Sequence, residues 1–168
     1  MDNISIIIRN KNEAEFIGFA IQSCLDFFDR PQIIVINNNS VDDSMDVVQN
    51  FNNRTEIIIK NLTSYKPGQS INAGVRASSN DYLLVLSGHT QLTRINFDLI
   101  KKDLDNHLAV FGKQTPIYKG KKITPGYIWS NFTDKKEINK FSSIENRFFL
   151  HNAFCFYKRN TLIEFPMP

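Results

Sequence analysis

Three short polar segments, each following a run of apolar residues, hold the side chains best suited to binding a ligand. The first contains Arg9, Asn10 and Glu13, the second covers residues 37–40, and the third is Ser-Gly-His at 87–89. An arginine supplies a fixed cation for a phosphate, and asparagine amides can match the edge of a base. An imidazole can bind a divalent cation or a phosphate oxygen. The residue types predict a site for a ligand that carries both anionic and hydrogen-bonding groups.

Each segment also has a purely structural interpretation, which the sequence leaves open. Asn12 can cap a helix, and Glu13 can lie in the first turn of that helix, where its dipole favours an anion. Asn39 suits a left-handed turn. A single histidine in a loop, such as His89, can be structural or simply exposed.

The apolar runs are predicted strands, and amphipathic helices alternate with them. Strands are expected at 4–9, 32–36, 56–60, 82–87, 108–115 and 152–158. Helices are expected at 13–28, after a cap at Ser40 or Asp42, after Pro67-Gly68, and at 95–107. Residues 117–146 lose this periodicity and predict an irregular region, with one short helix around 142–148. Trp129 in that region can stack on a sugar ring or belong to the core.

This alternation predicts an α/β fold, with an open, mostly parallel sheet and helices on both faces. In such sheets, ligands bind outside the carboxyl ends of the strands. Arg9-Asn10, Asn37-Asn38 and the segment 87–89 are therefore expected to share one edge of the sheet. We refer to the carboxyl ends of these three strands as the strand-end rim.

The composition is that of a soluble globular domain. The chain has 168 residues, 42% hydrophobic and 22% charged, with a net charge of +3. This balance allows contact with anionic substrates or a membrane surface, but no dense run of lysines indicates nucleic-acid binding. Cys24 and Cys155 lie in apolar contexts and are expected to be reduced, buried thiols, which favours a cytoplasmic location. No signal peptide or run of about 20 apolar residues is found.

Several segments together resemble family 2 glycosyltransferases. They are "ISIIIRNKNEAEFIGFAIQS", "IIVINNNSVDDS" and "YKPGQSINAGVRASSNDYLLVLSGH", in the order and spacing of that family. A narrower resemblance is to the rhamnosyltransferase-like branch of bacterial surface-polysaccharide enzymes. That branch has serine, a small residue and histidine in place of Asp-x-Asp, and a Gly-Arg-Gln-x-Pro segment that here reads "GKQTP" at 112–116.

The resemblance implies a GT-A fold and an inverting transfer of a sugar from a nucleotide-sugar donor to a hydroxyl acceptor. It implies one domain over 1–168, with a nucleotide-binding half at 1–116 and an incomplete acceptor-side half at 117–168. A glycan or lipid-linked acceptor is expected, which allows peripheral contact with the inner face of the cell membrane. The expected cofactor is Mn²⁺ or Mg²⁺, with His89 as a ligand.

The expected donor-binding residues line the strand-end rim and the loop before the third helix: Arg9, Asn10, Glu13, Asn38, Lys66, Gln69, Ser87 and His89. Gln114 and Asn152 match motifs of the branch and are expected on the acceptor side. Asn72 can serve the donor or anchor the backbone. Lys66 has an equally good interpretation as a solvated side chain.

Two departures from the family pattern matter. Asn37 replaces the usual first aspartate of the second segment, and Asn38 and Asp42 are its expected substitutes. The catalytic base of the family, a Glu-Asp pair, follows a segment like "IEFPMP", so the base is expected beyond Pro168. Three explanations stay open: the sequence is a fragment of a longer protein, the natural protein is truncated, or the chain is not catalytic as it stands.

Other function classes stay open at this point. A nucleotide-binding or interaction module with the same fold but no turnover is the principal alternative. A Rossmann-type oxidoreductase is disfavoured because no G-x-G-x-x-G follows the first strand, and a nucleotidyltransferase because no glycine- and lysine-rich loop does.

Overall fold

The computed structural model describes residues 2–122 and 132–168, so Trp129 lies outside the described residues. Contacts divide the chain into two compact units. Unit 1 comprises 1–110 and 152–168, and unit 2 comprises 111–151. The boundaries between these units fall at 110/111 and 151/152. The expected halves, 1–116 for binding the nucleotide and 117–168 for binding the acceptor, are functional divisions and stay a prediction.

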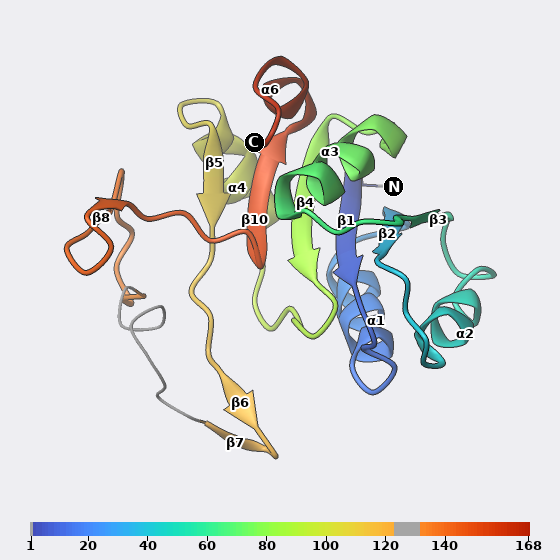
Figure 1. The fold of residues 1–168 in the computed structure, drawn as a ribbon. Helices are drawn as coiled ribbons and strands as arrows, with labels where there is room; N and C mark the ends of the chain where they lie inside the picture. Colours follow the sequence, from blue (N-terminus) through green and yellow to red (C-terminus); the bar gives the residue numbers. More distant parts are fainter. Residues whose placement is uncertain (1, 123–131) are drawn as a thin grey trace. The chain divides into compact units, whose positions relative to one another are not determined.

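Alternating strands and helices make up unit 1 (Figure 1). In chain order they are β1 (Ile4–Asn10), α1 (Ile17–Phe27), β2 (Gln32–Asn37), α2 (Ser44–Gln49), β3 (Ile57–Asn61), α3 (Pro67–Ala77), β4 (Tyr82–Ser87), α4 (Phe97–Leu104), β5 (Ala109–Phe111), β10 (Phe154–Lys158) and α6 (Arg159–Glu164). The last residue of β5, Phe111, belongs to unit 2.

The described strands form a six-stranded sheet in the order β3-β2-β1-β4-β10-β5. The strands β3, β2, β1 and β4 run parallel to one another, and β10 runs antiparallel to β4. The predicted open, mostly parallel sheet is therefore confirmed. Its register pairs Arg9 with Ser87 and Asn10 with Asn37, which brings the ends of β1, β2 and β4 together as the sequence predicts.

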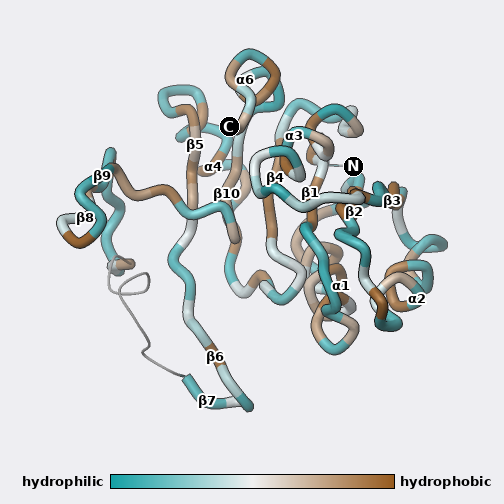
Figure 2. Tube along the Cα trace, viewed as in Figure 1, coloured by the Kyte–Doolittle hydropathy of each residue, from teal (hydrophilic) through white to brown (hydrophobic). Residues whose placement is uncertain are grey.

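Helices cover both faces of the sheet. On one face, Ile6 and Ile8 of β1 belong to a cluster that also contains Ile17, Ile21 and Cys24 of α1. This cluster draws further residues from α2, α4 and the neighbouring strands. Figure 2 shows the hydrophobic character of β1 and β4 and the hydrophilic loop that follows β1.

The opposite face of β1 packs against α3 (in front of the sheet in Figure 1) through Ile7. Gly74 of α3 lies so close to β1 that a Cβ there would be 2.4 Å from Cγ2 of Ile7. A larger residue would force the helix away from the sheet. The close approach holds α3 against the middle of β1, and the start of α3 lies against the C-terminal residues Met167 and Pro168.

Unit 2 consists of short hairpins and loops. Strands β6 (Ile117–Tyr118) and β7 (Lys121–Lys122) pair antiparallel, as do β8 (Phe141–Ser142) and β9 (Arg147–Phe148). The helix expected around 142–148 is therefore wrong. Asn146 has a φ of 50°, a left-handed conformation that ends a right-handed helix, and it turns the chain between β8 and β9.

Other boundaries differ from the predicted ones. Helix α1 begins at Ile17, so neither Asn12 as its cap nor Glu13 in its first turn is correct. Asn12 instead has a φ of 53°, and its side chain accepts a hydrogen bond from the backbone of Val41. Strand β5 ends at Phe111, and the short helix α6 after β10 was not predicted.

Both cysteines are free and buried, as expected. Burial raises the pKa of each thiol, Cys24 and Cys155, to about 12. Among the described residues, no helix has the length and apolar character to cross a membrane.

Candidate functional site

Arg9 lies at the centre of the strand-end rim. Its Nη2 donates hydrogen bonds to the hydroxyl of Ser87 at 3.3 Å and to the carbonyl of Asn152 at 2.8 Å. Its Nε is buried and has no partner in the part of the chain that the structure describes. Both bonded oxygens are neutral, and no described carboxylate lies within ion-pair distance. The rim therefore holds a half-buried cation without a counter-ion.

Asn10, the last residue of β1, follows Arg9 directly, so its side chain points to the opposite face of the sheet from that of Arg9. It is 2% exposed, and its amide nitrogen donates to the hydroxyl of Ser40 at 3.0 Å. Its Oδ1 is buried without a described partner. The Asn10 carbonyl accepts from the backbone N–H of Asn38 at 2.9 Å, which joins the ends of β1 and β2.

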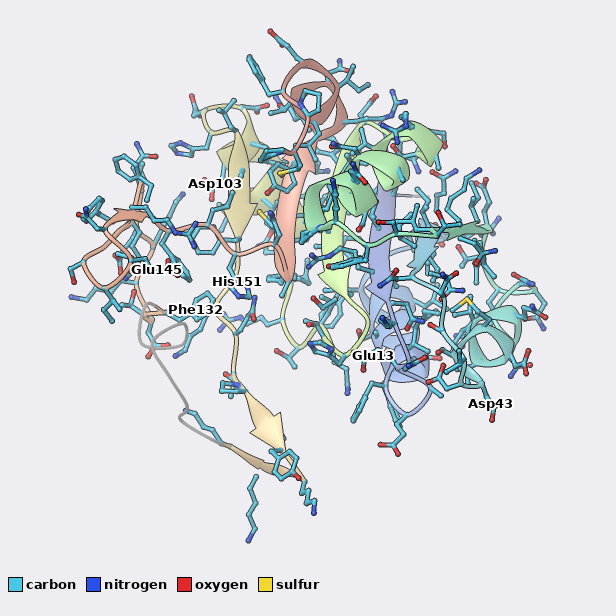
Figure 3. The ribbon with its side chains drawn as sticks, viewed as in Figure 1. Glu13, Asp43, Asp103, Phe132, Glu145 and His151 are labelled. Atoms are coloured by element: carbon cyan, nitrogen blue, oxygen red, sulfur yellow. The ribbon has the colours of Figure 1, made fainter. Side chains whose placement is uncertain are left out.

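Glu13 and His89 form the third contact of the rim. Oε1 of Glu13 lies 2.7 Å from Nδ1 of His89. Glu13 projects from the loop after β1, and Figure 3 labels it below the ends of β1 and β4. The sequence placed both residues at this rim but did not predict that they contact each other.

The backbone of the loop after β4 is fixed against β1. The N–H of Gly88 donates to the carbonyl of Arg9 at 2.9 Å, and the N–H of Thr90 donates to the carbonyl of Ser87 at 2.9 Å. A Cβ on Gly88 would be 3.2 Å from both the Arg9 carbonyl and Asn10 Oδ1. Only glycine fits here without displacing its neighbours.

Ser40 and Asp42 hold the loops after β1 and β2 together, a role that the sequence did not reveal. The hydroxyl of Ser40 accepts from the backbone of Asn12 at 3.0 Å. Asp42 accepts from the backbone of Ala14 at 2.9 Å and also from Ser44. The Ser44 hydroxyl, followed by the backbone N–H donors, lowers the pKa of the Asp42 carboxyl. Asp42 therefore has a structural role in this loop, and its expected contact with the donor stays a prediction.

Lys66 and Gln69 are exposed at the start of α3. The carbonyl of Lys66 accepts the N–H of Ser70, and neither the Lys66 nor the Gln69 side chain has a described hydrogen bond. The exposure of Lys66 fits its alternative interpretation as a solvated side chain, and the expected donor contacts of Lys66 and Gln69 stay predictions.

Asn72 anchors the backbone. Its side chain donates to the carbonyl of Met167 at 2.8 Å and accepts from the N–H of Met167 at 2.9 Å. This paired contact holds the segment "FPMP" against α3. Of the two roles considered for Asn72, the structure shows the anchor.

The two expected acceptor-side residues lie in different units. Asn152 belongs to unit 1, where its carbonyl binds Arg9 and its side chain accepts from the hydroxyl of Tyr157. Burial raises the pKa of that tyrosine. Gln114 belongs to unit 2, where its amide nitrogen lies 2.7 Å from Nδ1 of His151.

An aromatic cluster surrounds His151 within unit 2. Its ring centroid lies 5.9 Å from that of Phe132 and 6.1 Å from that of Phe149, and Figure 3 labels His151 and Phe132. Gln114 is thus tied to this cluster by its bond to the imidazole. No periodicity in the sequence indicated the cluster.

The whole sequence match decides the family. Residues 5–165 match the family described as Glycosyl transferase family 2. The chain belongs to glycosyl transferase family 2. No curated protein matches the sequence significantly.

Solved structures of glycosyltransferases share the fold of this family 2 chain. The structure of TarS 1–349 from S. aureus superposes with a TM-score of 0.67 at 16% identity, covering 96% of this chain and 48% of that one. TarS has also been solved with UDP-GlcNAc. The mannosyltransferase PcManGT from Pyrobaculum calidifontis, in complex with GDP-Man and Mn²⁺, gives a TM-score of 0.50 at 13% identity, covering 55% of this chain and 29% of that one.

These identities establish the fold alone, which is the GT-A fold predicted from the sequence. The chain spans about half the length of the TarS 1–349 structures that it matches.

Proposed function

We propose that the family 2 chain binds a nucleotide-sugar donor at the strand-end rim and transfers its sugar to a hydroxyl acceptor. The observation that carries this proposal is the environment of Arg9. A half-buried guanidinium with only neutral partners is costly unless an anion completes it. The diphosphate of a nucleotide sugar is such an anion, and Arg9 lies at the edge of the sheet where open α/β folds bind ligands.

The remaining rim residues supply complementary groups. Ser87 carries a hydroxyl beside the guanidinium, and His89 carries an imidazole that is 59% exposed. As the bond between sugar and diphosphate breaks, charge develops on the leaving oxygen, and fixed cations near it lower the barrier. We also propose contacts to the nucleoside and the donor sugar from three further side chains. These are Asn38, whose backbone N–H joins the end of β2 to β1, Lys66 and Gln69.

A divalent cation fits this rim only with help from the donor. Within residues 2–122 and 132–168, no group of three or more His, Cys, Asp or Glu side chains could hold a metal ion. His89 is the rim residue proposed as a metal ligand, so diphosphate oxygens and water would complete the shell of Mn²⁺ or Mg²⁺. Bound there, the cation would neutralise charge on the leaving diphosphate.

Finer aspects of the proposal rest on the resemblance to the rhamnosyltransferase-like branch. They are inversion at the anomeric carbon, a role in cell-surface glycan synthesis, and a glycan or lipid-linked acceptor reached at the inner face of the membrane. Gln114 and Asn152 are proposed on the acceptor side, and the general base is proposed to follow Pro168. A base within hydrogen-bond reach of the acceptor hydroxyl is required for the transfer.

Two measurements test the function. Calorimetric titration with UDP, GDP, CDP and dTDP, with and without Mn²⁺, determines whether the rim binds a nucleoside diphosphate. Release of nucleoside diphosphate from the matching nucleotide sugars then determines whether the donor turns over. Binding with turnover supports the transferase. Binding without turnover, also in the chain extended beyond Pro168, supports the nucleotide-binding module instead. The absence of binding contradicts both.

A further inference from the structure

The contact between Glu13 and His89 assigns Glu13 a role that its position in the sequence did not suggest. The two residues are 76 positions apart, and Oε1 of Glu13 lies 2.7 Å from Nδ1 of His89. The Glu13 side chain is 21% exposed, whereas that of His89 is 59% exposed. The carboxylate is thus the sheltered partner, and the imidazole is the partner more exposed to solvent.

The backbone holds Glu13 in place. Its carbonyl accepts from the N–H of Phe16 at 2.9 Å and from the N–H of Ile17 at 2.8 Å, so Glu13 is tied to the start of α1. Its Cγ would be 3.3 Å from a Cβ on Gly88, which shows how closely the two loops pack. The pair is therefore built by two fixed loops rather than by two mobile side chains.

This geometry determines which ring nitrogen of His89 a ligand meets. An ionised carboxylate only accepts hydrogen bonds, so Nδ1 must carry the proton that Glu13 binds. Nε2 is then the nitrogen left for the ligand, as in sites where a carboxylate sets the tautomer of a histidine ligand. In the neutral ring its lone pair can bind a cation held by the diphosphate, and in the imidazolium its N–H can donate to a diphosphate oxygen. We propose that Glu13 is a positioning residue that fixes the ring and tautomer of His89 so that Nε2 faces the diphosphate. The identity of the ligand in this inference rests on the proposed function. The position of the proton on the His89 ring does not, because it follows from the contact with Glu13.

The alternative is that Glu13 contacts the donor itself, through a ribose or base hydrogen bond, as its position at the rim first suggested. The two roles predict different coupling between the residues. A positioning residue acts only through His89, so removing Glu13 has no further effect once His89 is gone. A direct donor contact is lost independently of His89, and the two losses multiply.

The experiment is a double-mutant cycle on nucleoside diphosphate binding by calorimetry, with wild type, Glu13→Ala, His89→Ala and the double variant. We expect Glu13→Ala to weaken binding about ten-fold in the wild-type background. In the His89→Ala background we expect less than about a two-fold change. Glu13→Gln, whose amide oxygen can still accept from Nδ1–H, should recover part of the loss. Glu15→Ala, an exposed carboxylate two positions away, is the matched control and should bind as wild type does.

Nitrogen chemical shifts of His89 give a second readout that needs no ligand. In the neutral ring of the wild type, the proton is expected on Nδ1, and Glu13→Ala should shift the ring toward the Nε2–H tautomer. Multiplying losses in the cycle, or an Nε2–H tautomer in the wild type, would overturn the positioning role. If the wild type binds no nucleoside diphosphate, the proposed function fails, and the tautomer measurement alone decides the role of Glu13.

Discussion

Nη2 of Arg9 donates a 2.8 Å hydrogen bond to the carbonyl of Asn152, across 143 positions of sequence. The same nitrogen also reaches Ser87, at the end of β4, the strand that separates β1 from β10. One guanidinium therefore ties the end of the first strand to the fourth strand and to the chain entering β10. A residue in this position serves both the sheet and any anion bound at its edge.

Replacing Arg9 with alanine should affect stability and ligand binding together. The carbonyl of Asn152 and the hydroxyl of Ser87 lose their donor, and we expect the free energy of unfolding to fall by about 1–3 kcal/mol. Affinity for nucleoside diphosphates should fall as well, because the cation is gone. Denaturant unfolding and calorimetric titration measure the two effects. Arg94→Ala, an exposed arginine in the loop before α4, is the control. Unchanged nucleotide affinity in folded Arg9→Ala would exclude Arg9 from the site.

His89→Ala should weaken donor binding without unfolding the domain. His89 is exposed, so its removal leaves no cavity, and surface changes of this kind usually alter stability by less than about 0.5 kcal/mol. The loss of one charge-assisted contact to the diphosphate predicts a fall in affinity of about ten-fold or more. His107→Ala, a histidine between α4 and β5, provides the comparison. A drop in stability with unchanged nucleotide affinity in the remaining folded protein would contradict the prediction.

The parallel sheet could be predicted because its signals are local. Runs such as Ile4 to Ile8 are β-branched and apolar on both faces, and polar residues end each run. Those ends share one edge in any parallel sheet, so the meeting of Arg9 with Ser87 followed from topology. The hairpins of unit 2 could not be predicted, because strands of two residues have no periodicity. Asn146 set the turn there through a left-handed backbone that the composition did not reveal.

Contacts within the site depend on side-chain directions that no pattern records. Glu13 was expected to lie in the first turn of a helix or to face a ligand, but α1 begins four residues later and leaves Glu13 free to reach His89. Asp42 was expected as a substitute ligand residue, and its hydrogen bonds to Ala14 and Ser44 show a structural role. In both cases the loop conformation, rather than the residue type, decided the contact.

Gly88→Ala should disturb the rim directly. The added Cβ would be 3.2 Å from two oxygen atoms, the Arg9 carbonyl and Asn10 Oδ1, and 3.3 Å from Cγ of Glu13. Two of these neighbours are held by hydrogen bonds, so we expect a loss of about 1–3 kcal/mol in unfolding free energy. We also expect a weaker affinity for nucleoside diphosphates. Thermal unfolding with and without nucleotide measures both. Wild-type stability together with wild-type affinity would show that the two loops separate without cost.

The buried thiols predict a stability that falls in alkali. The pKa of Cys24 and that of Cys155 are each raised to about 12 by burial, whereas an exposed thiol has a pKa of about 8.5. Because the native state holds these protons more tightly, the contribution to stability is complete below about pH 8.5. It is lost as pH rises toward 12, by roughly 1.4 kcal/mol per pH unit for each thiol.

Urea unfolding at pH 8 and pH 10 measures this loss, with the variant Cys24→Ala/Cys155→Ala as the reference for every other titrating group. The wild type should lose more stability than the variant between the two pH values. Both thiols should also resist alkylation at pH 8 until the protein unfolds. An equal pH dependence in the two proteins, or rapid alkylation of the native state, would contradict the burial of the thiols.

The binding of a nucleoside diphosphate to the strand-end rim is the central claim, and a thermal-unfolding titration tests it most directly. A ligand that binds only the native state raises the unfolding temperature as its concentration exceeds the dissociation constant. We predict that at least one of UDP, GDP, CDP and dTDP raises the midpoint progressively up to millimolar concentration, and that Arg9→Ala and His89→Ala reduce the shift. No shift with any of the four, with or without Mn²⁺, would contradict the account.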